Sequence, residues 1–227
     1  MAPRARYAAG SACPTLAMAT RKIRQPPIAY ALEQVFIDQE RDLVHDTIAP
    51  VLAWVPGKGA AKKAQPFCFE VERVQRGQRS LITIELSWGV PALESLIPGL
   101  RDHVRRLQTS RSAQREHITE LAAYGLTFVA ISVLMPGRRA KAFRKGSPPD
   151  ILLDLTPNAL RGVETAGRST GGRSALLAIR NGTPATAIKP KTAGKAAALV
   201  ARPDIVEVHL SLWSASPRIS IMEQVKP

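Results

Sequence analysis

Apolar residues recur at every second position in several stretches of the chain, which is the pattern of strands that bury one face. Within residues 79–88 the apolar positions Ile82 and Ile84 alternate with more polar neighbours, and the preceding stretch 67–74 is rich in β-forming residues. Between the two stretches lies Arg76-Gly77, a pair suited to a tight turn. The pattern therefore predicts a β-hairpin.

The C-terminal half shows similar stretches, separated by prolines and glycines. Two of its strands are predicted to pair across a turn at Pro157-Asn158. Apolar residues at helical spacing predict one helix before the hairpin and several shorter helices after it. The further strands are predicted at 138–143, 149–155, 161–167, 205–213 and 218–225, and the helices at 28–45, 101–107, 110–124, 170–181 and 195–201.

Residues 126–135 support two interpretations. Val129, Ile131 and Val133 are β-branched and favour a strand. The absence of any turn signal after Gly125 favours a continuation of the preceding helix. The sequence leaves this choice open.

Positive charge is concentrated in two parts of the chain. Its 227 residues include 32 Lys and Arg against 18 Asp and Glu, which gives a formal net charge of +14. Residues 136–202 hold 13 basic and 3 acidic residues, and residues 1–32 hold 5 basic residues and no acidic one. Such asymmetry favours a polyanionic partner, most often nucleic acid. A solvated surface encoded by an arginine-rich genome would carry similar charge, so charge alone does not show that the protein binds nucleic acid.

Membrane insertion and structural zinc find little support in the sequence. The longest apolar run, 126–135, is shorter than the roughly 18 residues that a membrane-spanning helix needs. Cys13 and Cys68 do not have the spacing of a metal site. We therefore expect a cytoplasmic protein. Residues 1–27 are interpreted as a disordered basic arm, with a transit peptide as the alternative.

Two carboxylates are predicted to meet on the paired strands. Asp150 begins one strand and Glu164 lies in the next, and adjacent antiparallel strands can bring such side chains together on one face. Two negative charges there repel each other unless a cation lies between them. Oxygen ligands suit Mg²⁺ or Mn²⁺, which can polarise a phosphodiester and activate water. Taken singly, each acid, and Asp154 as well, could serve only a turn or a solvated strand.

Pro149-Asp150 followed by Glu164-Thr165-Ala166 resembles the Pro-Asp…(Asp/Glu)-x-Lys signature of the restriction-endonuclease-like nuclease superfamily. The resemblance covers roughly residues 110–227. It implies a mixed sheet flanked by helices and metal ligands at Asp150 and Glu164. It also implies a third acid on the helix before the sheet, at Glu116 or Glu120.

Ala166 departs from the signature, whose lysine helps to orient the attacking water and to stabilise charge at the phosphate. Three explanations are open. Another cation substitutes, with Arg168 as the nearest candidate; the lysine was replaced in an engineered inactive chain; or the domain kept binding and lost catalysis.

Seven basic residues near the acids are expected to contact nucleic-acid phosphates. The glycine-rich stretch 167–173 precedes a predicted helix, whose backbone amides could hold a phosphate, although the glycines could serve only a turn. Arg173 and Arg180, seven positions apart, share one face of that helix. The seven residues are Arg138, Arg139, Lys141, Arg144, Lys145, Arg173 and Arg180.

The sequence thus predicts an α/β protein with a basic arm at 1–27, a helix-and-hairpin extension at 28–108 and a nuclease-like domain at 109–227. The expected function is metal-dependent cleavage or binding of DNA, in restriction, repair or defence. One alternative is a catalytically degenerate nucleic-acid-binding or assembly subunit. Another is a protein-interaction module whose basic face meets an acidic partner. A homo-oligomer is compatible with each.

Overall fold

The computed structural model describes residues 23–56, 65–109, 115–144, 146–183 and 192–227. Residues 1–22 of the predicted basic arm and Lys145 lie outside this part. The strands are β1 Ile23–Arg24, β2 Ile28–Ala31, β3 Phe67–Gln75, β4 Gln78–Ser87, β5 Ala142–Phe143, β6 Ile151–Asp154, β7 Leu160–Arg168, β8 Gly182–Thr183, β9 Thr192–Ala193, β10 Ile205–Ala215 and β11 Arg218–Lys226. The helices are the 3₁₀ turn η1 Leu32–Gln34 and the α-helices α1 Val35–Asp38, α2 Arg41–Trp54, α3 Val90–Leu96, α4 Leu100–Thr109, α5 Arg115–Leu134, α6 Gly172–Asn181 and α7 Lys195–Val200.

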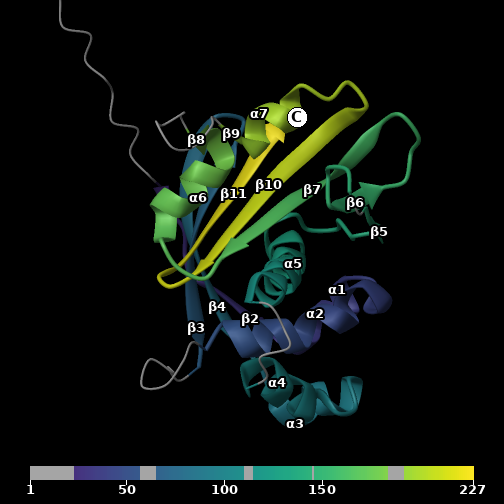
Figure 1. Cartoon of the computed structure of the whole chain (residues 1–227), viewed down its shortest axis with the longest axis vertical. Coiled ribbons are helices and arrows are strands. Elements are labelled where there is room, and N and C mark those ends of the chain that lie inside the picture. Colours follow the sequence, from purple (N-terminus) through teal and green to yellow (C-terminus); the bar gives the residue numbers. More distant parts are fainter. Residues whose placement is uncertain (1–22, 57–64, 110–114, 145, 184–191) are drawn as a thin grey trace, which may run out of the picture.

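A mixed sheet of nine strands organises the molecule, in the order β1-β4-β3-β11-β10-β7-β6-β5, with β2 also paired to β4. Helices cover both faces: α6 and α7 lie on one side, and α5 and α2 on the other (Figure 1). The expected α/β class, with a mixed sheet between helices, is confirmed. The predicted hairpins are also present, as β3–β4 and β6–β7.

Each face of the sheet buries its own set of apolar side chains, because successive residues of a strand point to opposite faces. Val163 and Trp213 belong to the large core beneath α5 and α2. Leu210 and Leu212 belong to a smaller core beneath α6 and α7. Ala166 packs at the edge of the smaller core, so the side of β7 that carries Glu164 and Ala166 faces α6 and α7.

Residues 126–134 are helical and complete α5, which settles the choice that the sequence left open. The β-branched residues are tolerated because the helix is buried between the sheet and α2, and a helix that is apolar all round belongs in a core. By length and composition α5 could also cross a membrane. Its burial in this fold accounts for the same composition.

Gly125 lets α5 approach α2 closely. A Cβ atom at this position would lie 2.6 Å from Cγ2 of Val51 and 3.1 Å from Oγ1 of Thr47. The glycine therefore does not end the helix, as a turn signal would, but allows two helices to pack.

We expect Gly125→Ala to lower the free energy of unfolding by about 1–2 kcal/mol, because the overpacking exceeds the roughly 1 kcal/mol by which alanine favours a helix. Urea denaturation measures this change. The control is Gln108→Ala on the exposed surface of α4, which should be neutral or slightly stabilising. Equal stability of Gly125→Ala and the unaltered protein would contradict the close contact.

Two local predictions are wrong. Residues 28–45 do not form one helix, because Ile28–Ala31 pairs in parallel with β4 before the chain turns into α1 and α2. The predicted strand 138–143 is reduced to Ala142–Phe143, because the residues before it form turns and contacts with other elements.

The sheet crosses the boundary predicted at residue 108. β3 pairs in parallel with β11, from Glu70 opposite Ile219 to Val74 opposite Glu223. The large core likewise combines side chains from residue 30 to residue 222. The extension and the nuclease-like domain predicted from the sequence therefore share one sheet and one core.

Candidate functional site

Asp150 and Glu164 are brought together by the register of β6 and β7. Ile151 pairs with Val163 and Leu152 with Gly162, so Asp150, one residue before β6, comes opposite Glu164. Gly162 is required for this approach, because a Cβ atom there would lie 2.3 Å from the carbonyl oxygen of Ile151. The predicted meeting of the two acids is therefore present in the structure.

Backbone hydrogen bonds hold Asp150 on both sides. Its Oδ2 accepts a hydrogen bond of 2.8 Å from the backbone N–H of Thr165, and its carbonyl oxygen accepts one of 2.8 Å from the N–H of Arg144. The preceding loop is fastened by Arg202, which donates to Ser147 over 3.1 Å and pairs with Asp204. The Asp150 carboxylate is thus held in place at the start of β6.

The two acids disfavour each other's charge. Burial, and after it the charge of the neighbouring Glu164, raise the pKa of Asp150 to about 6, against the lowering effects of the Thr165 N–H and Lys195. Glu164 is only 6% exposed, and its Oε2 is buried without a hydrogen-bond partner among the described residues. An unpaired buried carboxylate oxygen is costly unless a cation or a donor reaches it.

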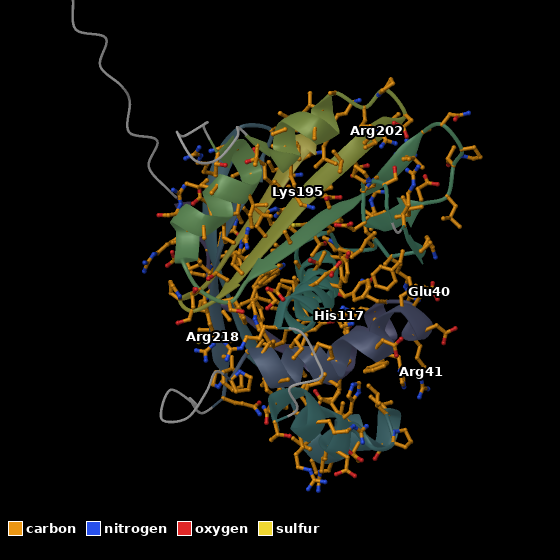
Figure 2. The ribbon with its side chains drawn as sticks, viewed as in Figure 1. Glu40, Arg41, His117, Lys195, Arg202 and Arg218 are labelled. Atoms are coloured by element: carbon orange, nitrogen blue, oxygen red, sulfur yellow. The ribbon has the colours of Figure 1, made fainter. Side chains whose placement is uncertain are left out.

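Lys195 is a site residue that the sequence did not reveal. It is the first residue of α7, and its Nζ donates to Oε1 of Glu164 and lies 3.5 Å from the carbonyl oxygen of Thr165. Figure 2 shows Lys195 on the α7 side of the sheet, with His117 of α5 on the other side. Lysine and glutamate are far apart in the sequence, so no spacing motif signals this contact.

Arg168 does not reach the acids. It lies on the same face of β7 as Glu164, but four residues further along the strand, which corresponds to roughly 13 Å. Its side chain is exposed and makes no hydrogen bond or ion pair within the described residues. Ala166 lies between the two on this face, and the cation beside Glu164 comes from α7 instead.

Glu116 and Glu120 are exposed on the first half of α5 and do not complete a three-carboxylate group with the pair. Glu120 accepts a hydrogen bond of 3.3 Å from the Tyr124 hydroxyl. Burial raises the pKa of Tyr124, and the nearby charges of Asp150 and Glu120 raise it as well. The phenol therefore remains protonated. Asp154 accepts from Thr156 at the turn and pairs with Arg161 over 2.8 Å, away from the site.

The described members of the predicted phosphate-contacting set are all engaged within the protein. The two arginines of α6 reach carboxylates of the sheet: Arg173 donates to Glu72 over 2.9 and 3.1 Å, and Arg180 pairs with Glu223. Both remain partly exposed. The contacts of the others are Arg138 to Glu207, Arg139 to the Ile37 carbonyl, Lys141 to Glu40, and Arg144 to the Pro148 carbonyl.

Comparison of this chain with protein-family models, curated proteins and solved structures finds no match. The site must therefore be interpreted from its own chemistry.

Proposed function

We propose that this protein is a metal-dependent nuclease-like protein of the cytoplasm, with a restriction-endonuclease-like core, that cleaves or binds DNA. The observation that carries the proposal is the buried, unpaired Oε2 of Glu164 opposite Asp150. A cation between the two carboxylates would satisfy this oxygen and remove their repulsion.

The donor set fits Mg²⁺ or Mn²⁺. Both donors are hard carboxylate oxygens, and within the described residues no histidine or cysteine joins them. Mg²⁺ is often held by one or two carboxylates together with water and substrate phosphates. Such an ion would neutralise charge on a phosphodiester and lower the pKa of a bound water.

The protein's own residues would position the reactants. Lys195 can donate from Nζ to a non-bridging phosphate oxygen, or to the attacking water, while it remains beside Glu164. In the hydrolysis, the water would give up one proton as its oxygen forms a bond to phosphorus, a phosphorus–oxygen ester bond would break, and the leaving oxygen would take up one proton. Lys195 is thus our candidate for the cation that the resemblance places at position 166.

The alternative is a DNA-binding or assembly subunit without cleavage. Ala166 favours it, because the lysine of the signature is missing and Lys195 comes from a different element. The internal ion pairs of Arg173 and Arg180 also leave fewer free cations for phosphate. The two functions differ in whether a bound divalent ion leads to cleavage.

The first experiment measures Mn²⁺ binding by calorimetry and cleavage of plasmid DNA by gel assay. We expect Asp150→Ala and Glu164→Ala each to lower Mn²⁺ affinity at least about 10-fold and to abolish cleavage. The matched control is Asp154→Ala, which removes a neighbouring acid that is already engaged by Thr156 and Arg161.

Equal Mn²⁺ affinity of Asp150→Ala and Asp154→Ala would contradict the metal site. Mn²⁺ binding without cleavage, together with salt-dependent DNA binding, would support the alternative function. Absence of both metal and DNA binding would favour the protein-interaction module.

A further inference from the structure

A polar cavity of about 250 Å³ lies on the face of the sheet that α5 covers, next to the end of that helix. Its walls come from β3, β10, β11 and the turn after α5. The volume is below the roughly 300–1,000 Å³ of pockets for drug-sized ligands, so the cavity suits a small molecule. Its charged residues play no part in the acid-pair site.

His209 lines this cavity and uses only one of its two ring nitrogens in a hydrogen bond with the described residues. His209 is only 8% exposed, and its Nε2 lies 3.1 Å from Oε1 of Glu207. Because a carboxylate only accepts, Nε2 carries the proton and donates. Burial lowers the pKa of His209, and the charges of Arg138 and Arg73 act in the same direction against Glu207, which favours the neutral ring. Nδ1 is then an acceptor without a partner among the described residues.

A second unpaired acceptor lies directly across the strands. Gln224 is the register partner of His209, and its Oε1 is buried without a hydrogen bond in the described part of the chain. A ligand that satisfies both positions must bring hydrogen-bond donors.

Two guanidinium groups line the same cavity. Arg73 donates to the carbonyl oxygen of Leu134 over 2.9 Å, and Arg138 donates to Glu207 over 2.8 Å. Each guanidinium has five N–H donors, so both retain donors for an anion. The cavity therefore combines two cationic donors and neutral acceptors with one carboxylate, Glu207, which Arg138 and His209 already engage.

We propose that this cavity binds a small phosphate monoester, with its charged oxygens at Arg73 and Arg138, its P–OH donating to Nδ1 of His209, and a hydroxyl of the ligand donating to Oε1 of Gln224. A phosphate monoester still holds its second proton on part of its molecules near neutral pH, since its second pKa is about 6. A carboxylate or a sulfate carries no such proton and would leave Nδ1 facing another acceptor. The inference is independent of the proposed function, because it involves neither a divalent ion nor DNA.

The test follows the His209 Cε1–H signal by NMR in metal-free protein at about pH 6.5, where phosphate carries a proton, during separate titrations with inorganic phosphate and with sulfate. We expect saturable binding of phosphate and at least about 10-fold weaker binding of sulfate, because sulfate cannot donate to Nδ1. Ribose 5-phosphate should bind at least as tightly as inorganic phosphate, and ribose should not bind.

Arg73→Gln should weaken phosphate binding about 10-fold or more, as expected for the loss of a charged donor. The control Arg76→Gln, in the exposed β3–β4 turn, should leave it unchanged. His209→Phe should remove the preference for phosphate over sulfate.

Equal binding of phosphate and sulfate by the unaltered protein would overturn the inference, as would absence of saturable binding. Equal effects of Arg73→Gln and Arg76→Gln would also overturn it. Should Arg73→Gln fail to fold, the inference is still tested by comparing the affinities of the unaltered protein for phosphate and for sulfate. Binding of phosphate but not of ribose 5-phosphate would overturn the assignment to a monoester.

Discussion

Lys195→Ala is expected to lower the rate of DNA cleavage about 10²–10³-fold, the typical cost of removing one donor from a transition-state charge. The reason is the place of its Nζ, which is held by Glu164 at the edge of the proposed metal site. Mn²⁺ binding should persist or become tighter, because the ammonium no longer competes for Glu164. Single-turnover cleavage assays and calorimetry measure the two effects separately.

The stringent form of this experiment adds Ala166→Lys. Position 166 lies two residues beyond Glu164 on the same face of β7, so a lysine there approaches the same carboxylate from the strand instead of from α7. We expect Lys195→Ala/Ala166→Lys to recover most of the lost rate. In Ala166→Lys alone, two ammonium groups crowd one carboxylate, and no gain is expected.

A suitable control is Lys226→Ala, which removes a lysine whose Nζ donates to the Arg202 carbonyl over 3.0 Å. Unchanged cleavage by Lys195→Ala would show that this lysine is not the catalytic cation. A folded double variant that remains as slow as Lys195→Ala would show that positions 166 and 195 are not equivalent.

Asp150→Asn should have opposite effects on stability and on metal binding. In the metal-free protein at pH 8 we expect it to raise the free energy of unfolding by about 1–3 kcal/mol, because a pKa shift of two units corresponds to nearly 3 kcal/mol and partial exposure reduces that value. The asparagine removes the repulsion with Glu164 and can still accept from the Thr165 N–H. Mn²⁺ affinity should fall at least about 10-fold.

The pH dependence follows from the direction of the shift. The pKa of Asp150 is raised from 3.8 to about 6, so the folded protein holds this proton more tightly than the unfolded chain. The stability that protonated Asp150 provides is complete below pH 3.8 and is lost as the pH rises through about 6. The advantage of Asp150→Asn should therefore be small at pH 4 and complete at pH 8, whereas Mn²⁺ binding by the unaltered protein should strengthen over the same range.

Urea denaturation at the two pH values measures the stability effect. Asp154→Asn is the contrasting control, because hydrogen bonds from Thr156 and Arg161 hold the pKa of Asp154 below its usual value. Its substitution should bring no gain at pH 8. A destabilised Asp150→Asn, with normal Mn²⁺ affinity, would contradict the mutual repulsion of the pair.

The acid pair could be predicted from the sequence because it depends on local geometry. A short turn links the strands of Asp150 and Glu164, and antiparallel pairing then determines which residues face each other. The contact of Lys195 depends on how α7 packs against β10 and β11, which no spacing in the sequence encodes. Arg168 lies on the same face of β7 as Glu164 but too far along the strand to reach it. The alternation of residues in a strand predicts which face a side chain occupies, but not which side chains on that face meet.

Contacts between segments that are far apart in the sequence also explain where the predicted fold was wrong. Residues 28–31 form a strand because β4 offers a parallel partner far along the chain, and such pairing overrides a helical pattern. The β-branched residues of α5 form a helix because the sheet and α2 bury them. In both cases the deciding contacts join segments that the sequence keeps apart.

The parallel pairing of β11 with β3 has a consequence for synthesis on the ribosome. β11 lies between β10 and β3, so it joins the hairpin of residues 67–87 to the strands that carry the acid pair. Until β11 emerges, the hairpin has one unpaired edge and the large core lacks Met222. The edge of β3 therefore stays unpaired while more than half of the sequence is synthesised. We expect the sheet to form slowly and the nascent chain to need chaperones during translation.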